Sequence, residues 1–286
     1  MPMNKLTSAK RAQVLQMMAE GISLRAITRL TGISRTTLIK LLEDAGQAFS
    51  DYQDRTLVNL KCKRVQVDEV WAFCYAKQKN VARAKAAPKG AGDIWTWVGL
   101  DADSKLAVSW HVGGRDSDEA IIFMDDLAKR LANRVQLTSD GHKAYLEAVE
   151  GAFGGDIDYA MLVKVYGAAP ESMKGRYSPA ECIGAEKRAI EGKPDPKHIS
   201  TSYAERQNLN IRMGNRRMTR LTNAFSKKAA NHNHMMAIYF MHYNFVRIHQ
   251  TLKITPAMAA GVTGKLWEMV DMVKVLEDWE AFQAAA

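Results

Sequence analysis

The spacing of apolar residues predicts three short helices over residues 7–45. The first is expected over residues 9–20, where Gly21 ends it. A second, LRAITRL, follows Ser23, which can cap it, and Thr31-Gly32 forms a turn. Ser34 can cap a third helix that continues through Leu42. Helices of this length and spacing are typical of a helix-turn-helix domain.

The third of these helices presents a polar face. Leu38, Leu41 and Leu42 would pack back on the first two helices, which leaves donors at the N-terminal end free to meet phosphates and base edges in a major groove. The residues expected to contact DNA there are Arg35, Thr36, Thr37 and Lys40. A small helical bundle used for protein contacts is the alternative.

From residue 64 the pattern changes to the period of two that marks strands. RVQVDEVWAFCY is the first strand, and IWTWVGLDAD and KLAVSWHVG continue a meander. A helix opens at Ser117, a short buried strand ends at Ser139, and AYLEAVEGAF and IDYAMLVKVYG add a helix and a strand. The order β-β-β-α-β-α-β predicts a mixed five-stranded sheet with helices.

These patterns divide the chain into regions. We expect a helix-turn-helix domain over residues 1–45, a polar linker over 46–63, an α/β domain over 64–222 and a C-terminal helical region over 223–286. The segment 168–200 is rich in Pro and Gly, so it is expected to be an insertion or loop. Helices are expected over 201–215, 223–250 and 263–282.

Composition narrows the class of protein. A chain of 286 residues that is 47% hydrophobic can bury two or three cores, which excludes a disordered tail. Its net charge of +9 suits a polyanionic partner, or merely a solvated surface. Cys62, Cys74 and Cys182 form no CxxC pair, so neither a zinc ribbon nor a disulfide framework is indicated. With no apolar run of about 20 residues, we expect a cytoplasmic protein that does not enter membranes.

Three acidic residues occupy positions where a carboxylate is informative. Asp68 interrupts an apolar strand, where its desolvation needs a compensating cation or donor. Asp140 follows a buried strand and precedes Gly141, at the sheet edge where ligands collect. Glu205 begins a helix. Glu69 is an alternative to Asp68, but strand alternation points it to the opposite face.

Three carboxylates suit phosphodiester chemistry. Two Mg²⁺ ions about 3.5–4 Å apart can activate a nucleophile and stabilise the leaving oxygen, and such hard ions take oxygen ligands. Helical spacing places Asn208 and Arg212 on the same face as Glu205, which adds an amide and a cation. The residues therefore point to an enzyme that acts on the DNA backbone.

The chain resembles a bacterial insertion-sequence transposase of the DDE type with an RNase H-like core. Its C-terminal segment YNFVRIHQTLKITPAMAAG is similar to the YNxxRxHxxLxxTPAxxxG ending of such proteins. VQVDEVW, TSDGHKAY and YAERQNLNIR resemble the three acidic blocks of the family named after the first numbered insertion sequence. One departure is that no Cys-pair zinc finger precedes the helix-turn-helix.

The resemblance implies specific roles. Asp68 would be the metal ligand shared by two ions of Mg²⁺ or Mn²⁺, with Asp140 and Glu205 as flanking ligands. The reaction implied is strand cleavage at the element ends and strand transfer into target DNA. Besides the residues of the third helix, those expected to contact double-stranded DNA are Asn208, Arg212, Arg216, Arg247 and His249.

An element with two ends further implies a homodimer or larger assembly. The candidate interface combines a Met-rich face at residues 235–245 with the C-terminal helix; packing within one subunit is the alternative. Its residues are Met235, Met236, Tyr239, Met241, Trp267, Met269, Val270, Val273, Leu276 and Trp279.

Several roles stay open on sequence alone. His142 and Tyr145 can contact the scissile phosphate, or His142 can simply hydrogen-bond its own loop. Arg247 and His249 can hold a phosphate or fix a helix against the core. A stand-alone RNase H-like nuclease and a helix-turn-helix regulator without catalysis are alternative functions, because fold does not fix function.

Overall fold

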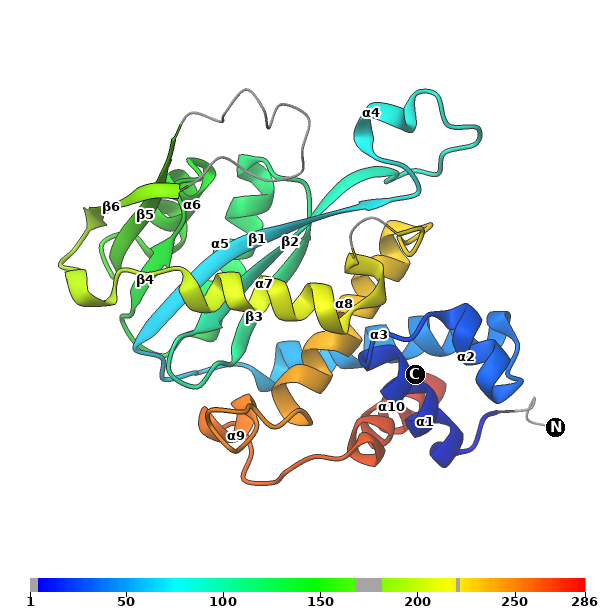
Figure 1. Ribbon diagram of the computed structural model, residues 1–286. Helices are drawn as coiled ribbons and strands as arrows, with labels where there is room; N and C mark the ends of the chain where they lie inside the picture. Colours follow the sequence, from blue (N-terminus) through cyan, green and yellow to red (C-terminus); the bar gives the residue numbers. More distant parts are fainter. Residues whose placement is uncertain (1–4, 168–181, 220–221, 286) are drawn as a thin grey trace.

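The N-terminal part of the chain folds as three helices. A computed structural model describes residues 5–167, 182–219 and 222–285 (Figure 1). It begins with α1 (Ser8–Ala19), α2 (Leu24–Thr31) and α3 (Arg35–Thr56). The expected caps are present, since the hydroxyls of Ser23 and Ser34 accept hydrogen bonds from backbone N–H groups two or three residues into each helix. Gly32 ends α2 with a φ of 73°.

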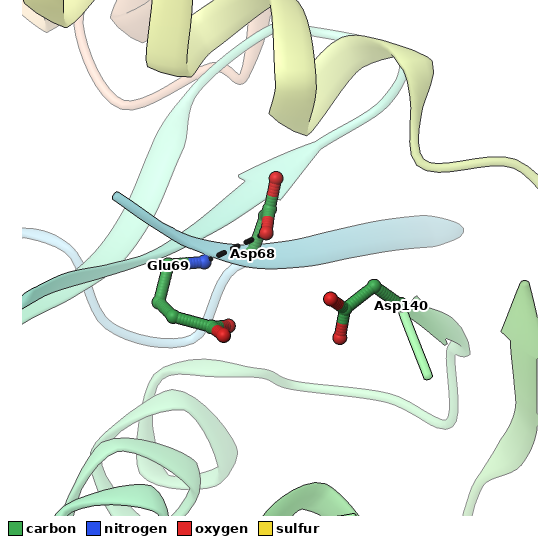
Figure 2. Close-up of side chains that lie close together, drawn as sticks. All are labelled: Asp68, Glu69 and Asp140. Atoms are coloured by element: carbon green, nitrogen blue, oxygen red, sulfur yellow. Dashed lines mark hydrogen bonds between the residues drawn. The ribbon is translucent and has the colours of Figure 1, made fainter. Parts of the chain in front are cut away.

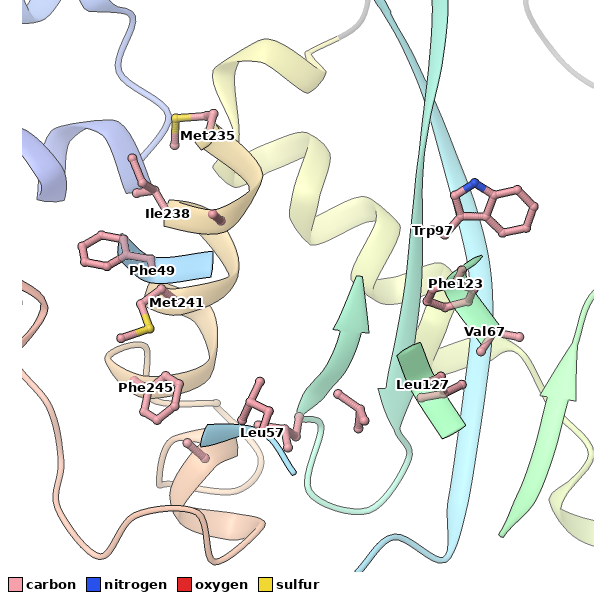
Figure 3. Close-up of a cluster of buried hydrophobic side chains, with 14 of the residues drawn as sticks. Phe49, Leu57, Val67, Trp97, Phe123, Leu127, Met235, Ile238, Met241 and Phe245 are labelled. Atoms are coloured by element: carbon pink, nitrogen blue, oxygen red, sulfur yellow. The ribbon is translucent and has the colours of Figure 1, made fainter. Parts of the chain in front are cut away.

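Helix α3 is longer than the sequence pattern predicts. An irregular linker was expected from residue 46, yet the helix continues without interruption for 22 residues to Thr56. One face of its second half is buried, because Ala45, Ala48 and Phe49 pack in the main core beside α8 (Ala229–Phe245; Figure 3). Polar residues on its outer side hide this apolar stripe in the sequence. The residues expected to form the linker are therefore helical as far as Thr56.

The end of α3 is tied to the sheet domain. Arg130, the last residue of α5 (Ser117–Arg130), donates to a carboxylate oxygen of Asp54 at 2.5 Å and to the carbonyl oxygen of Leu57 at 3.4 Å. Its Nε also donates to Asp126 at 2.7 Å. Gly46 allows a close approach on the other side of α3, since a Cβ there would lie 2.3 Å from the Cβ of His234 in α8.

A mixed sheet forms the middle of the molecule. Its strands are β1 (Arg64–Cys74), β2 (Gly92–Asp101), β3 (Ala107–Gly113), β4 (Gln136–Ser139), β5 (Asp158–Tyr166) and β6 (Cys182–Glu191). They lie in the order β3-β2-β1-β4-β5-β6. The pairs β1/β4 and β4/β5 are parallel, and the other pairs are antiparallel. A short helix, α4 (Gln78–Val81), lies in the basic connection between β1 and β2.

The sheet has six strands rather than the five expected. The sixth, β6, lies in the segment predicted to be an insertion or loop, of which residues 168–181 fall outside the described part. Every residue of β6 is exposed, and the strand is held at the edge by main-chain pairing with β5. Because no side chain of β6 is buried, the strand has no alternation of apolar and polar residues for the sequence to reveal.

Helices cover both faces of the sheet. Helices α5 and α6 (Ala144–Phe153) pack on one face, where Val67 and Trp97 meet Phe123 and Leu127 (Figures 1 and 3). Helix α7 (Ser202–Gly214) crosses the other face with α8 behind it, and Val70 lies in that second core. Two single-turn 3₁₀ helices, Pro196–His198 and Arg216–Met218, flank α7.

The C-terminal region packs on the N-terminal helices. After α9 (Pro256–Ala259), helix α10 (Met269–Ala285) lies against α1, and Arg11 makes two hydrogen bonds of 2.9 and 3.0 Å to Glu280. No helix among the described residues is long and apolar enough to cross a membrane.

The predicted Met-rich interface is mostly interior. Met235, Met236, Tyr239 and Met241 are buried within the chain, because α8 is enclosed by α3 and the sheet. In α10, Val273 and Leu276 are also buried. Val270 is 55% exposed and stays available to a partner; Trp267, Met269 and Trp279 are partly buried against the core.

Candidate active site

The sheet register brings two of the predicted carboxylates together. Parallel pairing sets Gln66 of β1 opposite Thr138 of β4. Two residues further along each chain are Asp68, within β1, and Asp140, just beyond the end of β4. Asp68, Glu69 and Asp140 each offer an oxygen, and these three atoms all lie within 4.8 Å of one another (Figure 2). Three oxygen donors at this separation match the preference of a hard divalent cation.

Asp68 faces α7. Its Oδ2 accepts a hydrogen bond of 2.8 Å from the side-chain amide of Asn208, and its Oδ1 accepts one of 2.9 Å from the N–H of Glu69. Gln66, on the same face of β1, accepts hydrogen bonds from the N–H groups of Tyr203 and Ala204 at the start of α7. The strand therefore positions the first turn of the helix above the carboxylates.

Glu69 points to the opposite face, as strand alternation predicts, but its longer side chain reaches back toward Asp140 (Figure 2). It is buried and already has partners: Arg115 lies 2.7 Å from its Oε1, and the hydroxyl of Tyr145 donates to its Oε2 at 2.8 Å. Asp140 accepts a hydrogen bond of 2.9 Å from the N–H of His142, which fixes its carboxylate in the loop after β4.

Glu205 lies in the first turn of α7 and is not part of the close carboxylate group. Its Oε1 accepts a hydrogen bond of 2.6 Å from Thr201 and forms an ion pair of 2.7 Å with Lys164 of β5. Burial is the largest single influence on Lys164 and lowers its pKa. The hydrogen bond and charge of Glu205, together with the charge of Asp68, outweigh burial, so the pKa of Lys164 is raised. Lys164 thus lies in the electrostatic field of the two acids.

The electrostatics of the site favour a bound cation. Burial, together with the nearby charges of Glu69 and Asp140, raises the pKa of Asp68 to about 7. Burial and Asp140 also raise the pKa of Glu69. A divalent ion among these oxygens would offset the repulsion and the lost hydration. The buried Oδ1 of Asn208 and Nε2 of His142 have no hydrogen-bond partner among the described residues, so two polar atoms next to the carboxylates are available to a ligand.

Arg212, two turns after Glu205 on α7, is held by main-chain carbonyls. Its guanidinium donates to the carbonyl oxygens of Trp71 at 3.1 Å and Met218 at 3.3 Å. It also lines a cavity at the C-terminal end of α7. Arg216, expected with it as a DNA contact, is exposed in the 3₁₀ turn that follows.

The residues expected to read DNA lie at the exposed start of α3. Arg35, Thr36 and Lys40 are exposed, and Thr37 is half-buried, with its hydroxyl 2.9 Å from that of Ser34. Lys40 pairs with Asp44 at 2.7 Å, a surface ion pair that a phosphate can replace at little cost.

Arg247 and His249 lie at a separate groove of about 430 Å³. Lys105 and Arg206 also line this groove, so it concentrates positive charge beside the start of α7. Arg247 is exposed, whereas the Nδ1 of His249 is buried without a partner in the described part of the chain. The arrangement is compatible with both roles that the sequence left open for them.

Some site residues differ from expectation or were missed. Tyr145 is fully buried beneath Glu69, so it cannot contact a phosphate directly. His142 lies between Asp140 and the Trp97 ring, whose centroid is 5.9 Å from that of His142. Lys164 and Arg115 were not singled out. Each is a lone basic residue in an unremarkable segment, and its role depends on contacts with residues far away in the sequence.

Comparisons with known proteins add one domain assignment. Residues 4–45 match the helix-turn-helix domain of resolvase, so the three N-terminal helices are a helix-turn-helix domain. No curated protein matches the sequence. Among solved structures, the cryo-EM structure of the piggyBac transposase synaptic complex with hairpin DNA is similar, with a TM-score of 0.38 and 9% identity. That likeness covers 98% of this chain and 72% of the other.

Proposed function

We propose that the chain is a metal-dependent DNA transposase of the DDE type, with an RNase H-like core that cleaves and joins DNA at the ends of an insertion sequence. The observation that carries the proposal is the register of β1 and β4, which puts Asp68 and Asp140 in one oxygen-rich site under the first turn of α7. The resolvase-type helix-turn-helix adds a DNA-reading domain to that site.

The proposed ligands are Asp68, Asp140 and Glu205. Bound Mg²⁺ or Mn²⁺, two ions in our proposal, supplies Lewis acidity that activates the attacking oxygen and stabilises the leaving one. The charges of both Asp140, just beyond β4, and Glu205, on α7, act on Asp68, so it is the residue suited to be shared. Asn208 orients Asp68 through the hydrogen bond to Oδ2.

Glu205 is engaged through one oxygen only. Its Oε1 is paired with Lys164 and accepts the hydrogen bond of Thr201, which leaves Oε2 for a metal. Lys164 contributes a positive charge beside Glu205 and Asp68, and a positive charge near the reacting phosphate would stabilise the transition state. Lys164 is therefore proposed as a phosphate-facing residue of this site.

Binding of double-stranded DNA is proposed for two surfaces. Arg35, Thr36, Thr37 and Lys40 would enter the major groove at the element end. The second surface lies around α7 and the groove after α8, and its proposed contacts are Asn208, Arg212, Arg216, Arg247 and His249. Because one element has two ends, we further propose a dimer or larger assembly on DNA, which light scattering with paired ends would detect.

Cleavage and joining of oligonucleotides that carry the element ends test the proposal. Asp68→Asn, Asp140→Asn and Glu205→Gln should each abolish Mg²⁺-dependent cleavage while end binding persists, because binding depends on the helix-turn-helix. Asp125→Asn, on the helix α5 behind the sheet, is the matched control. Cleavage without joining would indicate a nuclease, and end binding with neither reaction would indicate a regulator.

A further inference from the structure

A cavity of about 600 Å³ lies beside the outer part of β1, where the connection between α7 and α8 passes. Backbone contacts fix this connection, since the N–H of Tyr75 donates to the carbonyl oxygen of Ser226 at 2.8 Å. The cavity lies along β1 and α7, the elements that carry Asp68 and Glu205, and strand alternation places the Trp71 side chain on the face of β1 that carries Glu69. Trp71 is three residues beyond Asp68 on β1, and Arg212 is seven residues beyond Glu205 on α7. Both spacings amount to about 10 Å.

One wall of the cavity is aromatic. Trp71, Phe73 and Phe225 are each half-buried, so part of every ring is open to a ligand. The ring centroids of Trp71 and Phe73 are 5.8 Å apart, and those of Phe73 and Phe225 are 4.7 Å apart. The rings are tilted by 37° and 36° to one another, so they form an aromatic wall that offers ring faces to a planar base.

The charged residues in the rest of the lining are all basic. Lys77, Arg212 and Arg217 contribute to it, and no acidic residue is among the described residues of the lining. Arg217 is half-buried, and its guanidinium donates to the hydroxyl of Ser226 at 2.8 Å. No carboxylate pairs with it in the part of the chain that the structure describes, and burial lowers its pKa to about 10. A buried cation without a counter-charge is stabilised by any anion that the cavity admits.

A second cavity with an aromatic lining differs in the charge of its lining residues. It has about the same volume, 560 Å³, and is lined by Tyr52, Trp279 and Phe282. Its charged lining residues are Arg55 and Asp278, of opposite sign. Aromatic rings alone therefore do not imply a cationic lining, whereas the cavity at β1 combines rings with basic residues, which suits a ligand with a flat ring and a phosphate.

We propose that the cavity at β1 binds an unpaired nucleotide of the DNA strand next to the bond that is cleaved. The base stacks on the Trp71 ring, and the adjoining phosphates contact Arg217 and Arg212. The proposal rests on the proposed function, because Trp71 lies three residues, or about 10 Å, beyond Asp68 along β1, which equals about three base steps of a strand. Stacking on aromatic faces accepts any base, so this subsite would add affinity for unpaired DNA without sequence preference.

The test compares two DNAs with the full-length protein in EDTA, so that no cleavage occurs. One is a blunt duplex, and the other is the same duplex with a single-stranded extension that carries 2-aminopurine. We expect Trp71→Ala to weaken binding of the extended duplex about fivefold or more, and of the blunt duplex less than about twofold. Trp71→Phe should restore most of the loss. Phe282→Ala, in the second aromatic cavity, should change neither. Arg217→Gln should weaken the extended duplex selectively, and Arg217→Lys should do so less.

Fluorescence of the wild-type protein provides a measurement that needs no variant. Stacking should quench one 2-aminopurine position of the extension more than the others. Equal quenching at all positions, or equal effects of Trp71→Ala on both DNAs, would overturn the proposal. Tight binding of thymidine monophosphate, matching the extended duplex, would also overturn it in favour of a free-nucleotide site. Because EDTA is present, failure of this test leaves Mg²⁺-dependent cleavage untouched, and loss of cleavage leaves base stacking untouched.

Discussion

The two faces of β1 carry neighbouring acids, Glu69 and Asp68, of which only Glu69 has a basic partner among the described residues. Glu69, on the face toward α6, is compensated inside the protein by Arg115 and the hydroxyl of Tyr145. Asp68, on the face toward α7, is held by a neutral amide and a backbone N–H, and no ion pair to it exists among the described residues. The charge of Glu69 is thus compensated by a cation of the protein, whereas the charge of Asp68 is not. A cation from solution would therefore be stabilised most on the face of β1 that carries Asp68.

Activity should separate the two acids most strongly. Asp68→Asn removes a proposed ligand and should lower Mg²⁺-dependent DNA cleavage about a thousandfold, equal to about 4 kcal/mol of transition-state stabilisation. Glu69→Gln keeps an oxygen for Tyr145 and should lower the rate far less. Single-turnover cleavage of end DNA measures both. Equal losses would mean that the two acids act as one unit.

Stability should separate them in the opposite sense. Glu69→Ala leaves the buried hydroxyl of Tyr145 without an acceptor and breaks the Arg115 ion pair, so we expect a loss of about 2–3 kcal/mol in the free energy of unfolding. Asp68→Ala relieves carboxylate repulsion and should be close to neutral. Urea unfolding in EDTA gives both values. A larger loss for Asp68→Ala would contradict the contrast.

A buried histidine extends the comparison to pH. Burial, and then the charge of Arg217, lowers the pKa of His232 in α8 to about 3. Below about pH 6.5 the unfolded chain takes up a proton at His232 that the folded chain does not, so the protein becomes less stable as the pH decreases. Between pH 8 and pH 5.5 the loss in the free energy of unfolding is about 1.4 kcal/mol. Urea unfolding of His232→Gln should show this part of the pH dependence removed. An unchanged slope would assign it to other groups.

The smallest expected effect is stabilisation by metal. If 10 mM Mg²⁺ binds with a Kd of about 2 mM, it adds about 1 kcal/mol to the free energy of unfolding. Asp68→Asn and Asp140→Asn should lose this gain, and Glu69→Gln should keep most of it. Thermal unfolding with and without Mg²⁺ checks the order, with Ca²⁺ as a second hard cation. A gain that survives Asp68→Asn would place the ion elsewhere.

Local signals in the sequence predicted much of the fold and part of the candidate site. Ser23 and Ser34 cap their helices because capping depends on neighbours in the chain. Asp68 and Asp140 are recognisable because each ends or interrupts an apolar strand. The pairing of Lys164 with Glu205 and of Arg115 with Glu69 was not predictable, since it depends on which strands become neighbours. The exposed strand β6 and the buried half of α3 were missed because partners elsewhere in the fold stabilise them.

The uninterrupted helix α3 fixes the distance between its exposed N-terminal turn and the sheet domain. Its exposed first turn is proposed to read DNA, and its last turn is fastened to α5 by Arg130. A helix of 22 residues is about 33 Å long, close to one turn of B-form DNA. In the proposed transposase, such a rigid helix would fix the number of base pairs between the recognised sequence and the cleaved bond. An end sequence displaced by half a helical turn would present its recognised bases on the wrong side of the duplex.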